Sequence, residues 1–380
     1  MKVLLAGGGT AGHINPALAI AGAVKKHQPD AEILFVGNQK GMEARLVKEA
    51  GYDFAAVDVR GFRRSLSPGN IVYNIGAARR ALTSTMQAGK ILASFRPDIA
   101  VGTGGYVSGP VLRKASKMGI PIVVHEQNAY PGVTNRMLSK SASCVMLAVE
   151  DAKSHFDGSC HIEVTGNPLR REILTYTRQQ ARQELGLGDE PVILSFGGSL
   201  GADCINRAVA DLLAWSYKRG GITHIHGVGK AGWEWMPKLI ESKGVPLKRA
   251  KNIMVREYID DMARCMAAAD LVICRCGAIT LSELQAQGKA SILVPSPHVA
   301  ENHQYHNAMS LVRRGAAVLI EDQDLTGPKL ITQVEKLLEH PETLQEMGSK
   351  AKQTAILDAS ERIYKVILEA VSLKKESIRP

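Results

Sequence analysis

Short apolar runs alternate with longer mixed segments along this chain. Residues 2–6 form an apolar run, which is followed by a glycine-rich stretch at 7–12 and by an apolar helical pattern with Pro16 in its first turn. The same order returns at 192–213, where an apolar run leads into Gly197-Gly198 and then into a helical pattern. Continuous apolar runs of this length are typical of strands buried on both faces of a parallel sheet. The pattern therefore predicts an α/β protein whose two halves each open with a strand, a glycine loop and a helix.

Further runs of strand length are separated by helical patterns such as 41–50 and 77–95. They lie at 33–36, 99–101, 120–124, 222–228, 253–255, 271–274 and 291–294. We predict two Rossmann-like domains with parallel sheets, facing each other across a cleft. Pro168 restricts the backbone before a polar helix, which favours a boundary there. The predicted domains are 1–165 and 166–345, and a charged amphipathic helix within 346–380 closes the fold.

Composition excludes several classes of protein. Hydrophobic residues make up 45% and charged residues 22% of the 380 positions, which is ordinary globular usage and disfavours disorder or a coiled coil. The longest uncharged stretch, 3–24, contains several glycines and Pro16 and does not predict a membrane-spanning helix. The run 3–6 is too short for a signal peptide, so we expect a cytoplasmic chain with reduced cysteines.

The net charge of +10 is concentrated in one segment. Residues 60–117 carry ten Lys and Arg against the single acid Asp98, so this segment alone has a charge of +9. Such a field favours an anionic partner: nucleic acid, a phosphorylated ligand or an anionic membrane surface. Aromatic residues amount to only 5%, and no nucleic-acid-binding module is recognisable. We therefore predict no nucleic acid partner.

Three glycine loops follow predicted strands, at 7–12, 102–109 and 197–202. Such loops let backbone amides approach a phosphate, and the following helix adds its positive dipole end. The dinucleotide fingerprint fits poorly and no nucleoside-triphosphatase P-loop occurs. The loops predict an anionic ligand; tight turns that serve only packing remain the alternative.

Polar side chains also gather at predicted strand ends. His13 starts a helix, whose dipole favours the neutral imidazole that a general base needs; a capping or core histidine is the alternative. Residues 125–128, His-Glu-Gln-Asn, follow another strand, where a ligand site or a hydrogen-bonded turn would both fit. Residues 277–283 start a helix that could hold a diphosphate, with Glu283 accepting hydroxyl donors, or merely form a cap.

Metal sites are not predicted. Residues 301–307 are dense in hydrogen-bonding side chains and suggest an edge that contacts a sugar, but the nearby histidines lack convincing ligand spacing. Asp322 and Asp324 form a DxD pattern in a polar loop, which we interpret as a solvated turn. We expect neither a metal nor an organic cofactor.

Six motifs in order span nearly the whole chain and carry a family resemblance. They are GGTAGH at 8–13, GTGGYVSGP at 102–110, HEQN at 125–128, GNPLR at 166–170, GGSLGA at 197–202 and GAITLSE at 277–283. With them the chain resembles the MurG family, the bacterial peptidoglycan N-acetylglucosaminyltransferases of the GT-B fold and glycosyltransferase family 28. The resemblance implies an inverting transfer of GlcNAc from UDP-GlcNAc to the muramyl 4-hydroxyl of lipid I. The product would be lipid II, used in peptidoglycan synthesis, cell-wall biogenesis, cell shape and division.

The same resemblance implies roles for individual residues. Thr10, Ala11 and Gly12 would line the first loop beside the diphosphates; Asn128 would bind GlcNAc; Arg170 and Ser199 would meet the donor diphosphate; Ile259 would contact uracil through its backbone; Ala278, Ile279, Thr280, Leu281, Ser282 and Glu283 would hold diphosphate and ribose; and Gln304 and Asn307 would contact sugar hydroxyls. Two positions depart from the family pattern: Ala11 replaces a frequent Gly, and Leu200 replaces a frequent Gln.

An inverting transfer needs a base for the acceptor hydroxyl and a stabiliser for the leaving UDP. We assign the base to His13, oriented by Glu126, and the stabilising groups to Arg170, Ser199 and the helix start near Ala278.

A lipid acceptor implies docking on the anionic cytoplasmic face of the bacterial cell membrane, as a peripheral protein. The +9 segment would supply attraction and shallow apolar insertion, and a solvated basic face is the alternative. The residues concerned are Ile71, Val72, Tyr73, Ile75, Leu82 and Met86, beside Arg63, Arg64, Arg79, Arg80 and Lys90. Other cell-wall synthesis proteins are further candidate partners. The rival enzymes are a diacylglycerol glycosyltransferase and a UDP-GlcNAc 2-epimerase.

Overall fold

The computed structural model describes residues 1–59, 61 and 68–377; residues 60, 62–67 and 378–380 lie outside the described part. Contacts divide the chain into two compact units. Unit 1 comprises Met1–Leu169 together with Ile356–Pro380, and unit 2 comprises Arg170–Ala355. The chain therefore leaves unit 1 once and returns to it near its end.

Unit 1 is built on a parallel sheet of seven strands in the order β3-β2-β1-β4-β5-β6-β7. The strands are β1 (Lys2–Gly7), β2 (Glu32–Gly37), β3 (Asp53–Ala56), β4 (Ile99–Gly104), β5 (Ile122–Glu126), β6 (Cys144–Leu147) and β7 (Ile162–Val164). The helices are α1 (Ala11–His27), α2 (Met42–Glu49), α3 (Pro68–Phe95), α4 (Gly105–Lys117), α5 (Val133–Ser139) and α14 (Ala359–Ser377). The strand order reverses between β1 and β4, and such a switch point is where open parallel sheets bind ligands.

Unit 2 repeats the plan with six parallel strands in the order β10-β9-β8-β11-β12-β13. The strands are β8 (Val192–Phe196), β9 (Thr223–Gly227), β10 (Ile253–Arg256), β11 (Leu271–Cys274), β12 (Ala290–Leu293) and β13 (Ala317–Leu319). Its helices are α6 (Arg178–Leu185), α7 (Asp203–Arg219), α8 (Met236–Ser242), α9 (Met262–Ala268), α10 (Ala278–Gln287), α11 (His303–Val312), α12 (Gly327–Leu338) and α13 (Pro341–Gln353). The two sheets confirm the predicted pair of Rossmann-like folds.

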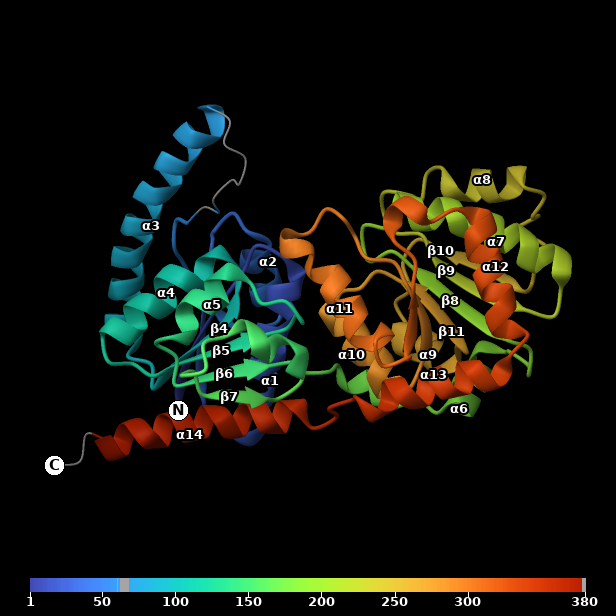
Figure 1. The fold of residues 1–380 in the computed structure, drawn as a ribbon. Helices are drawn as coiled ribbons and strands as arrows, with labels where there is room; N and C mark the ends of the chain where they lie inside the picture. Colours follow the sequence, from blue (N-terminus) through green and yellow to red (C-terminus); the bar gives the residue numbers. More distant parts are fainter. Residues whose placement is uncertain (60, 62–67, 378–380) are drawn as a thin grey trace. The chain divides into compact units, whose positions relative to one another are not determined.

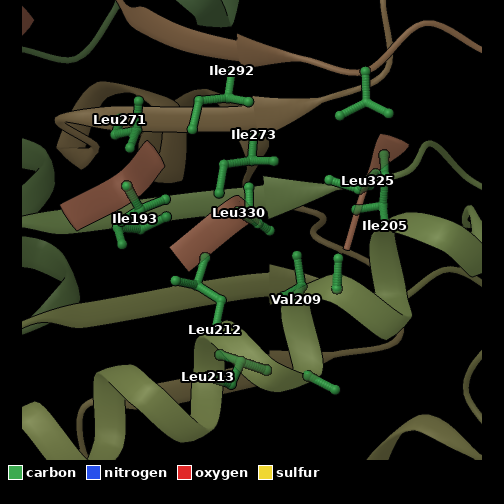
Figure 2. Packing of buried hydrophobic residues seen from close by; sticks show 14 of the residues in the cluster. Ile193, Ile205, Val209, Leu212, Leu213, Leu271, Ile273, Ile292, Leu325 and Leu330 are labelled. Carbon is green, nitrogen blue, oxygen red and sulfur yellow. The ribbon is translucent and has the colours of Figure 1, made fainter. Parts of the chain in front are cut away.

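Each sheet is buried because helices cover its faces. In unit 2, Ile193, Leu271 and Ile273 of the strands pack against α7 and α12 in one apolar cluster, as Figure 2 shows. In unit 1, Ile363 and Ile367 of α14 join the cluster formed by α1 and the strands. This burial explains the nearly continuous apolar runs of the strands.

The C-terminal segment differs from the expected single helix over 346–380. Two helices, α13 and α14, are separated by residues 354–358 (Figure 1). The Thr354 hydroxyl donates to Ala351 O at 2.7 Å and accepts from Gln285 Nε2 at 2.7 Å. A side chain that bonds its own backbone and a neighbouring helix in this way favours the end of a helix. The break lets α13 pack in unit 2 while α14 packs in unit 1.

Among the helices of the described part, none combines the length and apolar character needed to cross a bilayer.

Candidate active site

The two glycine loops of unit 1 meet at the carboxyl ends of β1 and β4. A Cβ on Gly7 would collide with Thr103 Oγ1, and a Cβ on Gly105, whose φ is +80°, would collide with Gly8 O. Glycine is required at Gly105 because the two loops touch there through their backbones, and at Gly7 because the Thr103 hydroxyl fills the space that a Cβ would need. Packing is thus one reason for these glycines, and it brings the start of α1 beside Thr103.

A buried carboxylate that sequence analysis missed supports the first loop. Glu43 is 1% exposed; its Oε2 accepts from Gly9 N at 3.2 Å and its Oε1 accepts from Asn38 N at 2.9 Å. The Gly9 amide is therefore already satisfied by the protein. An anion at this loop would have to use the amides at the start of α1, where Thr10, Ala11 and Gly12 are exposed.

His13, the third residue of α1, lies between the ends of β4 and β5. Its Nδ1 is 3.0 Å from Thr103 O and 3.2 Å from Gln127 Oε1. In return the Thr103 hydroxyl donates to His13 O at 2.7 Å. The other ring nitrogen, Nε2, has no hydrogen-bond partner among the residues that the structure describes. His13 thus presents one free nitrogen from a fixed ring.

Glu126 does not orient His13 as the sequence-based hypothesis had it. Its Oε1 accepts from Asn128 N at 3.0 Å and Nδ2 at 3.1 Å, and its Oε2 accepts from Gly132 N at 3.0 Å and Asn135 Nδ2 at 2.8 Å. The carboxylate folds the turn after β5 because four donors of that turn converge on it. The groups that hold His13 are Thr103 and Gln127 instead.

Unit 2 contains a pocket at the carboxyl ends of β8 and β9. A Cβ on Gly201 (φ +84°) would collide with Val228 O, so the loops after these strands also touch through backbone. The pocket is lined by Arg170, Phe196, Gly198, Ser199, Gly227, Gly229, Glu257, Tyr258, Ile259, Met262, Thr280 and Glu283. Five residues predicted for substrate binding therefore come together: Arg170, Ser199, Ile259, Thr280 and Glu283.

Arg170 and Glu283 pair within this pocket, with Arg170 Nε 2.7 Å from Glu283 Oε1. The Glu283 side chain is 4% exposed, whereas that of Arg170 is 54% exposed. Burial raises the pKa of Glu283, and the bond to Arg170 acts against that rise. Glu283 Oε2 and both terminal nitrogens of Arg170 have no partner in the part of the chain described here. The pair is fixed, yet each member keeps groups for a ligand.

The other residues of α10 that were predicted to bind substrate differ in which groups they can offer to a ligand. Gly277 is the N-cap and offers no side-chain cap, so the amides of Ile279 and Thr280 have no partner within the helix. Leu281 is buried at 4% exposure and packs in the core. The Ser282 hydroxyl donates to Ala278 O at 3.1 Å. Backbone amides, rather than these last two side chains, are what α10 can offer to an anion.

Gln304 and Asn307 hold neighbouring loops of unit 2 and do not line the pocket. Gln304 Oε1 accepts from Ser296 N at 2.9 Å and from Cys276 N at 3.3 Å. Asn307 Nδ2 donates to Cys276 O at 3.1 Å. Both side chains therefore connect the segment after β11 to α11. Leu200, the departure in the second-unit loop, is 70% exposed.

Two buried histidines lie just behind the pocket. Ser195 Oγ is 2.8 Å from His224 Nε2 and 2.8 Å from His226 Nδ1, which ties β8 to β9 one residue before the lining residues Phe196 and Gly227. Burial lowers the pKa of His226 to about 4 and that of His224 well below its usual value. Both imidazoles are thus neutral near pH 7.

The DxD pattern is partly structural. Asp322 Oδ1 lies 2.5 Å from Arg275 Nη1 and accepts from Cys204 Sγ at 2.8 Å, so Asp322 is not the solvated turn residue that we expected. In the described part of the chain, no group of three or more His, Cys, Asp and Glu side chains is arranged to hold a metal ion.

Comparison with known proteins adds the family. Residues 3–147 match the glycosyltransferase family 28 N-terminal domain, and residues 192–363 match the glycosyltransferase family 28 C-terminal domain. The UDP-N-acetylglucosamine--N-acetylmuramyl-(pentapeptide) pyrophosphoryl-undecaprenol N-acetylglucosamine transferase of Acetivibrio thermocellus is 45% identical over 98% of this chain and 99% of its own.

Two solved structures are similar to this chain over nearly its whole length. MurG from Acinetobacter baumannii is 30% identical with a TM-score of 0.79, covering 97% of this chain and 99% of that one. UDP-GlcNAc 2-epimerase from Neisseria meningitidis, at 17% identity and a TM-score of 0.66 over 97% of this chain and all of that one, shares the fold. The GT-B fold class is therefore confirmed, while the facing of the two domains across a cleft stays a prediction. On the length and level of these matches, the chain belongs to the UDP-N-acetylglucosamine--N-acetylmuramyl-(pentapeptide) pyrophosphoryl-undecaprenol N-acetylglucosamine transferases of glycosyltransferase family 28.

Proposed function

We propose that this chain transfers GlcNAc from UDP-GlcNAc to the muramyl 4-hydroxyl of lipid I, with inversion, and so forms lipid II. The observation that carries the proposal is the pocket of unit 2, where the Arg170–Glu283 pair lies beside glycine-loop and helix-start amides. A cation and amides suit a diphosphate, and a carboxylate suits paired ribose hydroxyls. The names of the relatives support the same donor and acceptor.

The UDP part of the donor would be held by groups of unit 2. The free terminal nitrogens of Arg170 and the amides of Ser199 and Thr280 would contact the diphosphate, and Glu283 Oε2 would accept from the ribose. The backbone at Ile259 would contact uracil, since its side chain is buried against Gly227. Gln304 has its Oε1 in use, so it would reach a sugar hydroxyl through Nε2. Asn307 would assist there, and Asn128 would contact the GlcNAc from unit 1.

Chemistry then needs a base and an anion stabiliser. His13 Nε2 would accept the proton of the attacking hydroxyl as the bond to C1 forms, while the bond from C1 to the UDP β-phosphate oxygen breaks. Arg170 and the positive end of α10 would stabilise the charge that develops on UDP. No direct catalytic contact is proposed for Glu126 beyond holding the turn that carries Asn128.

The lipid acceptor would be met at the anionic cytoplasmic face of the membrane. Arg63 and Arg64 of the proposed docking segment lie outside the described residues, as do the side chains of Ile71, Val72, Tyr73, Ile75, Arg79, Arg80 and Leu82. Two of its members are described: Met86, on α3, is 64% exposed, and Lys90 is exposed on the same helix. An exposed apolar side chain beside a cation supports docking on an anionic bilayer.

One assay tests the function: UDP release from UDP-GlcNAc with and without a soluble lipid I analogue. We expect acceptor-dependent release in step with a disaccharide product. Glu283→Gln should weaken this activity, whereas Glu342→Gln, an exposed position of the same unit, should leave it unchanged. Release with diacylglycerol in place of lipid I would instead indicate the rival transferase. Conversion of the donor sugar without any acceptor would indicate an epimerase.

A further inference from the structure

A chain of buried hydrogen bonds runs from His13 across unit 1. His13 Nδ1 is 3.2 Å from Gln127 Oε1, Gln127 Nε2 is 3.0 Å from His125 Nδ1, and His125 Nε2 is 2.9 Å from Gly166 O. Gln127 is 2% exposed and His125 is fully buried, so water does not compete for these bonds. His13 Nδ1 also lies 3.0 Å from Thr103 O.

Two backbone carbonyls at the ends of this chain decide where every proton lies. Thr103 O can only accept, so His13 Nδ1 carries a hydrogen and donates it to Thr103 O and Gln127 Oε1. Gly166 O can only accept, so His125 Nε2 carries a hydrogen and His125 Nδ1 holds a lone pair. The amide of Gln127 satisfies both histidines in one orientation only, with Nε2–H donating to His125 Nδ1. The assignments from the two ends agree.

We infer that Gln127 and His125 are positioning residues that, together with Thr103 O, hold His13 as its Nδ1–H tautomer and so keep a lone pair on Nε2, the nitrogen left free for substrate. The inference rests on the proposed role of His13 as the base. Gln127 touches His13 and His125 touches Gln127, and neither is proposed to contact the reacting atoms.

The chain of hydrogen bonds from His13 through Gln127 to His125 differs from the usual support of a catalytic histidine because its middle member is an uncharged amide. When Nε2 accepts a proton, the Nδ1–H bond to Gln127 Oε1 strengthens but gains no opposing charge. Burial lowers the pKa of His125, which keeps that imidazole neutral and able to accept from Gln127. The ring of His13 is therefore held in place on its Nδ1 side by neutral groups.

The direct test is the tautomer itself, measured by NMR on full-length protein labelled with ¹⁵N and ¹³C in histidine. His13→Asn identifies the His13 signals by their loss. We expect neutral His13 to be Nδ1-protonated and His125 to be Nε2-protonated. A wild-type His13 protonated mainly on Nε2 would overturn the inference. This measurement needs no substrate, so it stands or falls apart from the transferase activity.

Two variants give the functional arm. Gln127→Met keeps the size of the side chain but removes its polar contacts with the His13 ring, the His125 ring and His125 O. His125→Phe removes the ring to which the amide donates and leaves the bond from Gln127 Nε2 to His125 O in place. We expect each to lower kcat about tenfold, with the KM for UDP-GlcNAc nearly unchanged. The spectrum should show a larger share of the Nε2–H tautomer of His13 than in wild type, with Thr103 O still favouring Nδ1–H. His161→Phe, an exposed histidine of unit 1, serves as the matched control and should change none of these. Unchanged kcat and an unchanged tautomer in a folded Gln127→Met protein would contradict the positioning role. If the wild-type chain transfers no GlcNAc at all, the proposed function fails. The His13 tautomer still tests whether Gln127 and His125 position that ring.

Discussion

Arg170 and Glu283 bind each other and still keep atoms for a ligand. Arg170 uses Nε to hold Glu283 and keeps its terminal nitrogens, while Glu283 uses Oε1 and keeps Oε2. The pair also neutralises a carboxylate that is 4% exposed. Because an unpaired buried charge is costly, neither residue can be changed without affecting its partner.

The first prediction concerns that coupling. Glu283→Gln should raise the KM or Kd for UDP-GlcNAc by at least about tenfold, because a charge-assisted hydrogen bond to the ribose is lost and Arg170 is left without its counter-charge. Isothermal titration with UDP-GlcNAc in the absence of an acceptor measures the Kd directly. Glu342→Gln, exposed in the same unit, is the control. If the two variants bind UDP-GlcNAc with equal affinity, Glu283 does not contribute to donor binding.

The second prediction concerns the base. His13→Ala should reduce kcat by about 10²-fold or more, since general base catalysis contributes at least that much. Steady-state kinetics on UDP-GlcNAc and a lipid I analogue provide the measurement. Near-normal kcat with only a raised KM would show that His13 binds substrate and does not take its proton.

The sequence indicates candidate side chains for the chemistry, but not which of their atoms are available to a ligand. His13 and Glu283 were named from motifs at helix starts, whereas Arg170 was named only through the family resemblance. The sequence did not indicate that Glu43 satisfies the Gly9 amide, since no local pattern links positions 34 residues apart. Likewise, the choice of Gln127 over Glu126 beside His13 depends on the geometry of a turn.

At the level of strands and helices, the apolar runs located nine strands but missed β3, β6, β7 and β13, although β6 is fully buried. The fully buried β4 and β8 appear as apolar runs, so they were located from sequence. The edge strand β7, with an exposed glutamate between two half-buried residues, has no such run. Its pairing with β6 arises from the sheet, not from its own composition.

The third prediction concerns the β8–β9 pair and its acid sensitivity. The pKa of His226 is about 4 in the folded protein against 6.5 ordinarily, so between these values the unfolded chain binds more protons. The free energy of unfolding of unit 2 should therefore fall as the pH falls from about 6.5 to 4. His226 alone contributes about 3 kcal/mol to that loss, at 1.36 kcal/mol per pKa unit. His224 acts in the same direction.

Urea unfolding at several pH values between 7 and 4 measures this effect. His226→Asn, which cannot titrate in this range, should be less stable than wild type at pH 7 but lose less stability on acidification. Parallel pH profiles for the two proteins would mean that His226 is not the group responsible.

The fourth prediction concerns α14. Ile367 is fully buried against unit 1, whereas Leu373 of the same helix is 64% exposed. Ile367→Ala should lower the free energy of unfolding of unit 1 by about 2–5 kcal/mol, and Leu373→Ala should cost less than about 0.5 kcal/mol. Denaturant unfolding compares the two. Similar costs would mean that α14 does not pack as described.

On the scale of the whole molecule, the fold class followed from the repetition of strand, glycine loop and helix. The assignment of the final helix to unit 1 did not, because its apolar face would fit either sheet equally well by pattern alone. Only the contacts of Ile363 and Ile367 with the α1 cluster decide it. The activity likewise depended on the resemblance of six motifs and on family membership, since glycine loops by themselves suit many phosphate ligands.

The fifth prediction concerns docking of the whole protein on lipid. Replacing Arg79 and Arg80 by Glu should weaken binding to vesicles that contain anionic lipid by at least about tenfold, since each basic residue near such a surface contributes about 1 kcal/mol. Co-sedimentation measures it, with UDP binding as the control for an intact donor pocket. If the variant binds anionic vesicles as well as wild type does, Arg79 and Arg80 do not contribute to docking on the membrane.

The return of the chain to unit 1 at Ile356 has a consequence during synthesis. A ribosome delivers the whole of unit 2 before it delivers the helix that completes the first hydrophobic cluster. Until α14 has been synthesised, nascent unit 1 leaves an apolar face open to water, while all residues of unit 2 have already been made. The part of the protein that is made first is therefore finished last.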